Sequence, residues 1–329
     1  MKTQITYALI ASSKDTFLEE LWVSVYSLRQ YEKDREARVC CDAPTAELIY
    51  SHPSLMELIT EVVIIPTPEN YDAKHRSRHV KTLIREYVKG PFLYIDTDTV
   101  ICGTLDYIDN LSCDIAGVPE GNLPFKNNIF RRGVLKRMEA TFNLDVNSHP
   151  HWINGGVIYA ADTPFAHEFY RHWHENWEWS SSHKGMSQDM PGLLKAELDL
   201  NFVMDELPGY YNAQPFMSMQ YYGEAKIIHY VHTFFPEDQS FSPFLDKSIY
   251  LRIHEDGGIS KETANIILHA KSAIKSPSII VGERTVNFMT SRAENIFERI
   301  YAEGGFASWA MQKMAVFLEW LHDHTKKGV

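Results

Sequence analysis

Short apolar runs alternate with amphipathic segments over the first hundred residues of the chain. The runs have the length of buried strands and are bounded by turn-forming residues; they are Ile5–Ala11, Ala37–Cys41, Glu61–Pro66 and Phe92–Ile95. Between them, helical spacing of apolar residues predicts a helix over Phe17–Leu28 and a shorter one at Ala43–Tyr50. This alternation predicts an α/β fold with a mainly parallel sheet and right-handed crossovers.

The fourth run ends in a pair of aspartates. Asp96 and Asp98 follow it directly and apolar residues resume at Val100, so the pair interrupts a hydrophobic stretch. Unpaired carboxylates are costly to bury, and open α/β sheets bind ligands beyond the carboxyl ends of their strands. Two carboxylates there can supply hard oxygen ligands to one divalent cation. We interpret the pair as a metal site, with a solvated polar turn as the alternative.

The segment before this run carries three basic residues on one helical face. A helix is predicted from about Ser77 to Val88, with Arg78, Lys81 and Arg85 at positions i, i+3 and i+7. Because the helix leads into the acidic strand, its beginning is expected near the same crevice. Arg78 and Lys81 are therefore expected to meet either phosphate or the two carboxylates. Arg85 is predicted to lie on a solvated face.

Two further strands follow, separated by a polar segment. They are predicted at Asp114–Val118 and Trp152–Ala161. The segment Asn122–Pro150 is weakly periodic and is interpreted as either a mobile lid or a short helix over the site. The second strand opens with Asn154 and two glycines, which would let a ligand approach the backbone closely; a β-bulge is the alternative.

The aromatic residues of Pro164–Trp179 recur near every fourth position and predict a helix packed in the core. Three histidines on this segment share no face suited to a metal, and we interpret them as structural: His167, His172 and His174.

Two later polar residues also have purely structural interpretations. Ser187 is predicted to cap a helix, and the helix dipole by itself accounts for a carboxylate at Asp189 in the first turn. A strand is predicted at Ala225–His232. His229 interrupts its apolar face and, on the residues alone, is a core histidine that needs a partner.

Composition narrows the class of protein. The 329 residues carry a formal net charge of −11, which argues against a broad nucleic-acid surface. The four cysteines have no zinc-type spacing, so a reduced, cytoplasmic location is expected. The N-terminus does not read as a signal peptide, and no apolar run is long enough to span a membrane.

Five segments, in order, resemble the GT-A fold nucleotide-sugar glycosyltransferases, and most closely glycosyltransferase family 8. They are YIDTDTVI, INGGVIY, SQDMPGLL, LPGYYNAQ and KIIHYVH, within Ile5–Thr233. The resemblance implies a mixed, mainly parallel Rossmann-like sheet flanked by helices. It implies a nucleotide-sugar-binding catalytic domain over residues 1–240 and a C-terminal helical extension over 241–329.

The resemblance also assigns residues to roles. It implies that Mn²⁺ (or Mg²⁺) is held by Asp96, Asp98 and His229, which replaces the core interpretation of that histidine. Asn154 and Asp189 would act at the donor sugar as catalytic residues. The remaining positions would bind the metal-bound UDP-sugar: Ala8, Ile10, Ala11, Ser12, Arg78, Lys81, Thr97, Gly155 and Gly156.

Two positions depart from the family pattern. Many members carry glutamine after the donor-site aspartate, where this chain has Met190. Many also follow the late histidine with a glycine and a lysine that clasps the diphosphate, where this chain continues with Tyr230. We therefore assign no catalytic base or nucleophile.

The last third of the chain predicts helices outside the resemblance. Ser260 is expected to cap a helix reaching about Ile274, and Ser291 with Glu294 to begin another. A final helix follows Gly304–Gly305, with one apolar face: Phe306, Trp309, Ala310, Phe317, Leu318 and Leu321. We expect this face to pack on the chain or to form a homo-oligomer, rather than to contact a membrane, because its basic residues are few.

These observations predict a metal-dependent, retaining glycosyltransferase that moves a hexose, glucose or galactose, from a UDP-sugar to a glycan or other acceptor. Retention is the default that the resemblance carries. A metal-dependent nucleotidyltransferase is one alternative, but Ala11–Lys14 lacks the glycine-rich phosphate loop of such enzymes. A catalytically silent nucleotide-sugar or glycan-binding protein is the other, and both Met190 and the missing lysine after His229 favour it.

Overall fold

The computed structural model describes residues 2–128, 130–215, 217, 219–231, 242–245, 247–274, 300 and 304–325. The chain divides into two compact units. The larger comprises Met1–Asp238 and Ser242–Ile274, and the smaller comprises Gln239–Phe241 and Lys275–Val329. The predicted end of the catalytic domain at residue 240 stays a prediction.

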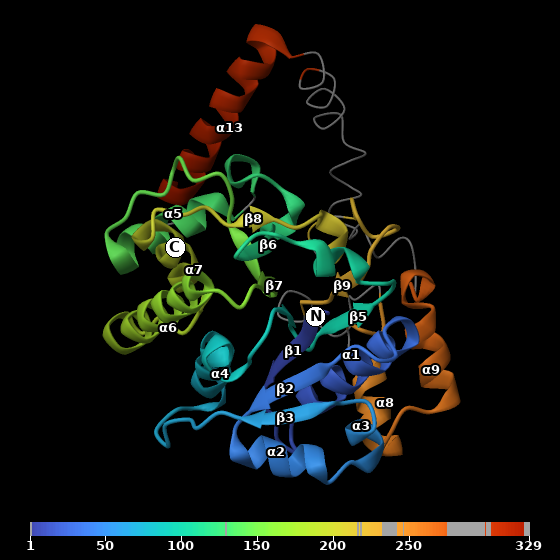
Figure 1. Cartoon of the computed structure of the whole chain (residues 1–329). Coiled ribbons are helices and arrows are strands. Elements are labelled where there is room, and N and C mark those ends of the chain that lie inside the picture. Colours follow the sequence, from blue (N-terminus) through green and yellow to red (C-terminus); the bar gives the residue numbers. More distant parts are fainter. Residues whose placement is uncertain are drawn as a thin grey trace. The chain divides into compact units, whose positions relative to one another are not determined.

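A mixed sheet forms the centre of the larger unit (Figure 1). Its strand order is β3-β2-β1-β4-β7-β6-β8, and β7 is antiparallel to both neighbours while the other pairs are parallel. The strands are β1 (Gln4–Leu9), β2 (Ala37–Cys41), β3 (Glu61–Ile64), β4 (Phe92–Ile95), β6 (Ile115–Pro119), β7 (Ile153–Ala160) and β8 (Asp205–Glu206). A second, antiparallel sheet pairs β5 (Thr99–Ile101) with β9 (Ile227–His229). The predicted α/β sheet is confirmed.

The helices of the larger unit follow the predicted order with a few additions. They are α1 (Phe17–Tyr31), α2 (Ala43–Tyr50), α3 (Pro53–Met56), α4 (Ala73–Tyr87), α5 (Arg131–Phe142), α6 (Pro164–Lys184), α7 (Met190–Asp199), α8 (Ser248–Asp256) and α9 (Lys261–Leu268). Short 3-10 turns lie at Asp106–Asn110, Glu120–Asn122, Phe125–Asn127, Gly209–Tyr211 and Ala270–Ser272.

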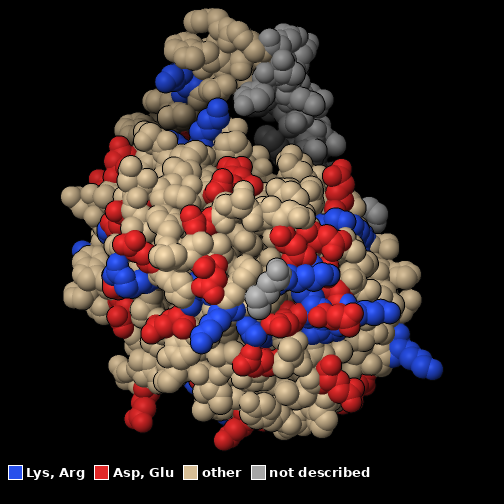
Figure 2. Space-filling model, in the orientation of Figure 1, with Lys and Arg blue, Asp and Glu red and all other residues tan. Residues whose placement is uncertain are grey.

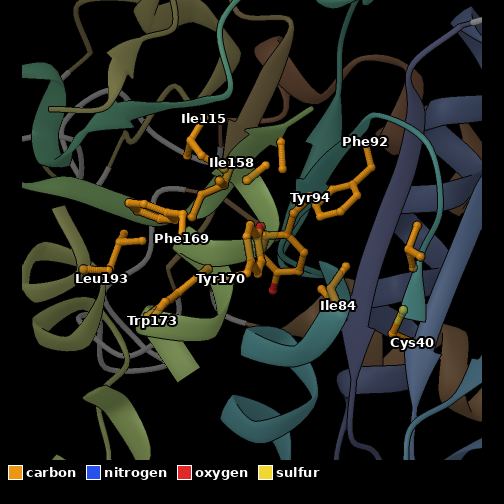
Figure 3. Close-up of a cluster of buried hydrophobic side chains, with 14 of the residues drawn as sticks. Cys40, Ile84, Phe92, Tyr94, Ile115, Ile158, Phe169, Tyr170, Trp173 and Leu193 are labelled. Atoms are coloured by element: carbon orange, nitrogen blue, oxygen red, sulfur yellow. The ribbon is translucent and has the colours of Figure 1, made fainter. Parts of the chain in front are cut away.

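One face of the sheet is covered by α4, α6 and α7, and the main core lies between them (Figure 3). Phe92 and Tyr94 of β4 point into this core, where they meet Phe169, Tyr170 and Trp173 of α6. Burying each large side chain of this kind stabilises the fold by roughly 1.5–3 kcal/mol.

The opposite face of the sheet is covered by α1, which also contacts β5, α8 and α9. There the hydroxyl of Ser24 donates to that of Tyr7 on β1 at 3.2 Å. Alternate residues of β1 and β4 therefore serve two different cores, as expected for strands buried on both faces.

Helix α4 begins at Ala73, four residues before the predicted start at Ser77. Its cap is Asp72, whose Oδ1 accepts a hydrogen bond from the backbone N–H of His75 at 2.8 Å. An aspartate at this position satisfies one of the free N–H groups of the first turn. Because of the earlier start, Arg78 lies in the second turn of α4 and Lys81 in the third.

The prediction of a solvated Arg85 is wrong, because its side chain is 1% exposed. The guanidinium donates to the carbonyl oxygens of Gly90, at 2.9 Å, and Ala161, at 3.2 Å. It also lies 4.7 Å from the centre of the Phe92 ring. The fork-shaped guanidinium thus ties α4 to the loop before β4 and to the loop after β7.

The two alternatives for Asn122–Pro150 resolve in favour of a short helix, α5. It packs through Val134 and Met138 on a small core with Phe125, Trp152 and Leu194. The bulge, the alternative interpretation of the β7 glycines, is present: Gly117 pairs with Ile158 but Val118 pairs with Asn154, so residues 155–157 have no partner on β6.

In the last third, the cap at Ser260 is confirmed, since its Oγ accepts from the N–H of Thr263 at 3.3 Å. The helix it begins ends at Leu268, short of the predicted Ile274. Helix α8 was not predicted because Lys247, in the left-handed region at its start, supplies no capping side chain. The predicted helix at Ser291–Tyr301 lies outside the described residues except for Ile300.

The final helix is confirmed as α13 (Gly305–Thr325), in the smaller unit. Among the described residues, no helix is long and apolar enough to cross a membrane. On the face drawn in Figure 2, basic and acidic side chains are interleaved, and no broad basic patch forms there.

Candidate active site

The two aspartates and the late histidine meet beyond the end of β4. Asp96 and Asp98 flank the turn between β4 and β5, and His229 ends β9, which pairs with β5 so that His229 lies opposite Thr99. Nε2 of His229 is 3.1 Å from Oδ1 of Asp98 and 3.9 Å from Oδ2 of Asp96. The ligand atoms of these three residues lie within 4.8 Å of one another, which suits one metal ion. Thr97 lies between the two aspartates and is partly exposed.

A neighbouring amide sets the orientation of His229. Its Nδ1 lies 3.1 Å from Oδ1 of Asn212, an oxygen that can only accept, so Nδ1 carries the proton. In the neutral ring this leaves Nε2 with a free lone pair facing the two carboxylates. Metal-binding histidines are commonly held by such a second hydrogen bond.

The chain of hydrogen bonds continues away from His229. Nδ2 of Asn212 donates to Oδ1 of Asn154 at 3.0 Å, and Nδ2 of Asn154 donates to Oε2 of Glu120 at 2.5 Å. Oδ1 of Asn154 also accepts from the backbone N–H of Gly156 at 2.9 Å. Asn154 is therefore the middle of a buried hydrogen-bond relay, which runs from His229 through Asn212 and Asn154 to Glu120.

Burial and charge oppose each other at both ends of this relay. Burial by itself lowers the pKa of His229, but Asp98 and then Asp96 outweigh it, so the pKa is raised above its usual value. Burial raises the pKa of Glu120, and the hydrogen bond from Asn154 only partly offsets it.

Close packing explains the second glycine of β7. A Cβ on Gly156 would lie 2.2 Å from Cε1 of His229 and 2.9 Å from Oδ2 of Asp96. A Cβ on Gly155 would lie 3.3 Å from Nζ of Lys81 and 3.4 Å from Oδ2 of Asp189. Gly156 thus borders the carboxylate of Asp96, and Gly155 borders the carboxylate of Asp189.

Asp189 forms ion pairs rather than the cap predicted from its position. It precedes α7, but its side chain makes no capping bond, and neither does Ser187, so the Ser187 cap is wrong. Oδ2 of Asp189 lies 3.2 Å from Nζ of Lys81, and Oδ1 lies 3.4 Å from Nε of Arg78. Burial raises the pKa of Asp189, but Lys81 and then Arg78 reverse this, so the pKa is lowered and the carboxylate is charged.

Lys81 links the two acidic groups of the site. Its Nζ lies 3.4 Å from Oδ1 of Asp96 and 5.0 Å from the centre of the Tyr94 ring. The Tyr94 hydroxyl donates to the same Oδ1 of Asp96. The structure thus brings Lys81 to a carboxylate of the acidic pair, one of the two outcomes that the sequence left open, whereas Arg78 pairs with Asp189 instead.

The residues predicted to hold the base and ribose lie at the end of β1. Ile10 is buried in the main core and Ala8 packs against it. The backbone N–H of Ala11 donates to Thr45 at 3.1 Å, and the hydroxyl of Ser12 donates to Asp15 at 2.7 Å. Their contact with a nucleotide stays a prediction.

Sequence reasoning missed Glu120, Asn212 and Tyr94. Glu120 directly follows β6, so its place after a strand was a usable signal. Asn212 lies within the quoted segment LPGYYNAQ but was given no role. Nothing local marks the Tyr94 hydroxyl as a partner of Asp96.

No protein-family model matches the sequence, and no curated protein matches it. Among solved structures, the glycosyltransferase GlyE of Streptococcus pneumoniae is 12% identical with a TM-score of 0.50, over 83% of this chain and 65% of GlyE. An active-site mutant of LgtC is 12% identical with a TM-score of 0.50, over 79% of this chain and 98% of LgtC. The galactosyltransferase LgtC with donor and acceptor sugar analogues matches over the same shares at 12% identity and a TM-score of 0.49.

At this level of identity the comparisons are evidence about the fold alone. The GlyE and mutant LgtC structures align with most of this chain, whose larger unit is built on the mixed sheet with flanking helices. The chain therefore has the GT-A fold, as its resemblance to GT-A glycosyltransferases implied.

Proposed function

We propose that the chain is a metal-dependent glycosyltransferase that transfers glucose or galactose from a UDP-sugar to a glycan or other acceptor, with retention. One observation carries the proposal: Asp96, Asp98 and His229 converge at the carboxyl ends of the strands, beside Lys81 and Asp189. Ligands of open α/β sheets bind at this edge.

The donor set fits a hard divalent ion. Two carboxylates and one imidazole suit Mn²⁺ or Mg²⁺, with Mn²⁺ favoured because it accepts nitrogen more readily. When bound, such an ion would neutralise the charge that develops on a departing diphosphate. Asp96, Asp98 and His229 would hold it: the hydrogen bond from Nδ1 of His229 to Asn212 aims Nε2 at the carboxylates, where the metal ion would take the place of a proton.

Two buried polar atoms also support a ligand here. Oδ2 of Asp189 lies 3.2 Å from Nζ of Lys81, and Nε of Arg78 lies 3.4 Å from Oδ1 of Asp189; among the described residues neither buried atom has a hydrogen bond besides these ion pairs. A sugar hydroxyl could donate to the first atom and a phosphate oxygen could accept from the second. The ammonium group of Lys81, which now contacts Asp96 and Asp189, would then also bind the diphosphate.

The silent binding protein is the second candidate, and one observation favours it. Many family 8 members place a glycine and a lysine after the histidine, whereas here Tyr230 follows it. Tyr230 is buried and stacks on Phe244, with ring centres 5.0 Å apart. The Tyr230 side chain therefore cannot serve as a cationic clamp for the diphosphate.

One assay separates the two candidates. Purified chain is incubated with a panel of UDP-sugars, with Mn²⁺, Mg²⁺ or chelator, and with or without candidate acceptor glycans, and released UDP is measured. Metal-dependent release with UDP-glucose or UDP-galactose supports the enzyme. UDP-sugar binding by calorimetry without any release supports the binding protein, and neither binding nor release rejects both.

A further inference from the structure

A second group of metal-type ligands lies outside the candidate active site. It comprises His149 and His151, just before β7, and Glu197 on α7. Their ligand atoms lie within 4.8 Å of one another. The three side chains are 6%, 2% and 1% exposed, so they face one another in a buried space.

Hydrogen bonds fix the tautomer of both histidines. Nδ1 of His149 lies 2.9 Å from the carbonyl oxygen of His151, which can only accept. Nδ1 of His151 lies 3.2 Å from Oε1 of Glu206 on β8, an acceptor when ionised. Both Nδ1 atoms therefore carry protons, and in the neutral rings both Nε2 lone pairs are free.

Both Nε2 atoms face the same carboxylate. Nε2 of His151 is 3.1 Å from Oε1 of Glu197, and Nε2 of His149 is 3.9 Å from Oε2. Two lone pairs facing a carboxylate in a buried space repel it unless a proton or a metal ion lies between them. A protonated His151 accounts for one of these contacts. It leaves Nε2 of His149 buried without a hydrogen bond among the described residues.

We propose that His149, His151 and Glu197 bind a transition-metal ion, of which Zn²⁺ is the best fit. Two imidazole nitrogens and one carboxylate oxygen are a typical zinc ligand set, and water can supply the fourth position. Glu206 and the carbonyl of His151 act as the outer partners that orient metal-bound histidines. This site differs in donors from Asp96, Asp98 and His229 and does not rest on the proposed function.

The ion would join two elements that carry the candidate active site. His151 lies three residues before Asn154, and Glu197 lies two helical turns after Asp189. A zinc ion between them would fix the start of β7 against α7. Its role is therefore structural, and its removal is expected to loosen both elements.

The test uses the full chain in an Asp98→Asn background, so that the first site is weakened. After dialysis against a chelator, the protein is titrated with Zn²⁺ by calorimetry, and with Co²⁺ as a visible probe of nitrogen ligation. We expect one equivalent of each metal and a rise in the thermal midpoint with Zn²⁺.

Three variants decide the assignment. His149→Gln should weaken Zn²⁺ binding at least tenfold, and the exposed control His183→Gln on α6 should leave it unchanged. Glu206→Gln, at a side chain that is 57% exposed, should fold normally and still weaken binding about tenfold. Absence of Zn²⁺ binding at micromolar concentration, or an affinity unchanged by both His149→Gln and Glu206→Gln, would overturn the proposal.

Discussion

Gly156 leaves no space for a side chain in the candidate active site. Its carbonyl oxygen accepts from the backbone N–H of Asp96 at 2.8 Å, which holds β7 against the turn that carries Asp96 and Asp98. The ring of His229 lies directly over its α-carbon, so the site has no room for a side chain there.

We predict that Gly156→Ala weakens Mn²⁺ binding more than tenfold, because the methyl group must displace the His229 ring. Gly155→Ala is the matched control: its methyl group meets the flexible end of Lys81 at 3.3 Å, the Asp189 carboxylate at 3.4 Å and Cγ of Met190 at 3.6 Å. Calorimetric titration with Mn²⁺ and UDP measures both. Equal affinities for the two variants would contradict the placement of His229 as a ligand.

A second prediction concerns the residues at the start of α7. Met190 packs partly against the small core of α5, and a thioether is at most a weak acceptor, so Met190→Leu should keep turnover within about tenfold. Asp189→Asn should lower turnover on the order of a hundredfold, because it removes the charge that Lys81 and Arg78 surround.

Turnover of both variants is measured at saturating UDP-sugar, with thermal midpoints as the control for folding. Loss of activity in Met190→Leu with retention in Asp189→Asn would show that this segment does not contact the donor sugar.

At the scale of elements, α4 and α6 are joined by a cluster of rings. His79 of α4 meets His174 and Trp177 of α6, with ring centres 5.2 and 6.4 Å apart. Nδ1 of His174 lies 2.8 Å from the hydroxyl of Thr82. The interpretation of His174 as structural agrees with this packing, and the two rings must remain uncharged to lie together.

This packing predicts a loss of stability in mild acid. Burial, and then His79, lower the pKa of His174 to about 4, whereas the unfolded chain binds the proton near its ordinary pKa of 6.5. The stabilisation is therefore complete above about pH 7 and is lost as the pH falls toward 4. Between pH 7 and 5, His174 alone should lower the free energy of unfolding by about 2 kcal/mol.

Urea unfolding at several pH values measures this loss. His174→Gln should remove about one proton from the pH slope, and His167→Gln, at a half-exposed side chain on the same helix, should not. A slope unchanged by His174→Gln would mean that this ring is not protonated on unfolding.

At the scale of the whole molecule, the smaller unit adds an amphipathic helix to the GT-A fold. Large apolar side chains of α13 are exposed, among them Phe306 (79%), Trp309 (54%) and Phe317 (54%). Exposed apolar surface of this extent commonly marks a site of association. We still predict that the apolar face of α13 packs either on a second copy of the chain or on another part of the same chain.

We predict that ending the chain after Gly304 changes its sedimentation or lowers its thermal midpoint, and leaves metal-dependent UDP release intact. Sedimentation velocity over a range of concentrations measures the first effect. Neither form is expected to bind anionic liposomes. Liposome binding by the intact chain that disappears on truncation would favour a membrane role for α13 instead.

The sequence alone determined most elements of the larger unit and the position of the acidic pair. Strand and helix periods are local properties, and so is the interruption of an apolar run by Asp96 and Asp98. The resemblance of five ordered segments then assigned a metal-binding role to His229 and a donor-site role to Asp189. Spacing by itself explained His229 as a core residue and Asp189 as part of a helix cap.

Only the tertiary structure decided which distant groups meet. Arg85 looked solvated because its carbonyl partners at Gly90 and Ala161 come together only when β4 and β7 pair. Glu120, Asn154 and Asn212 form one relay although more than ninety residues separate its ends. Such contacts follow from strand order and crossover geometry, which bring remote segments to one edge of the sheet and leave no periodic signal in the chain.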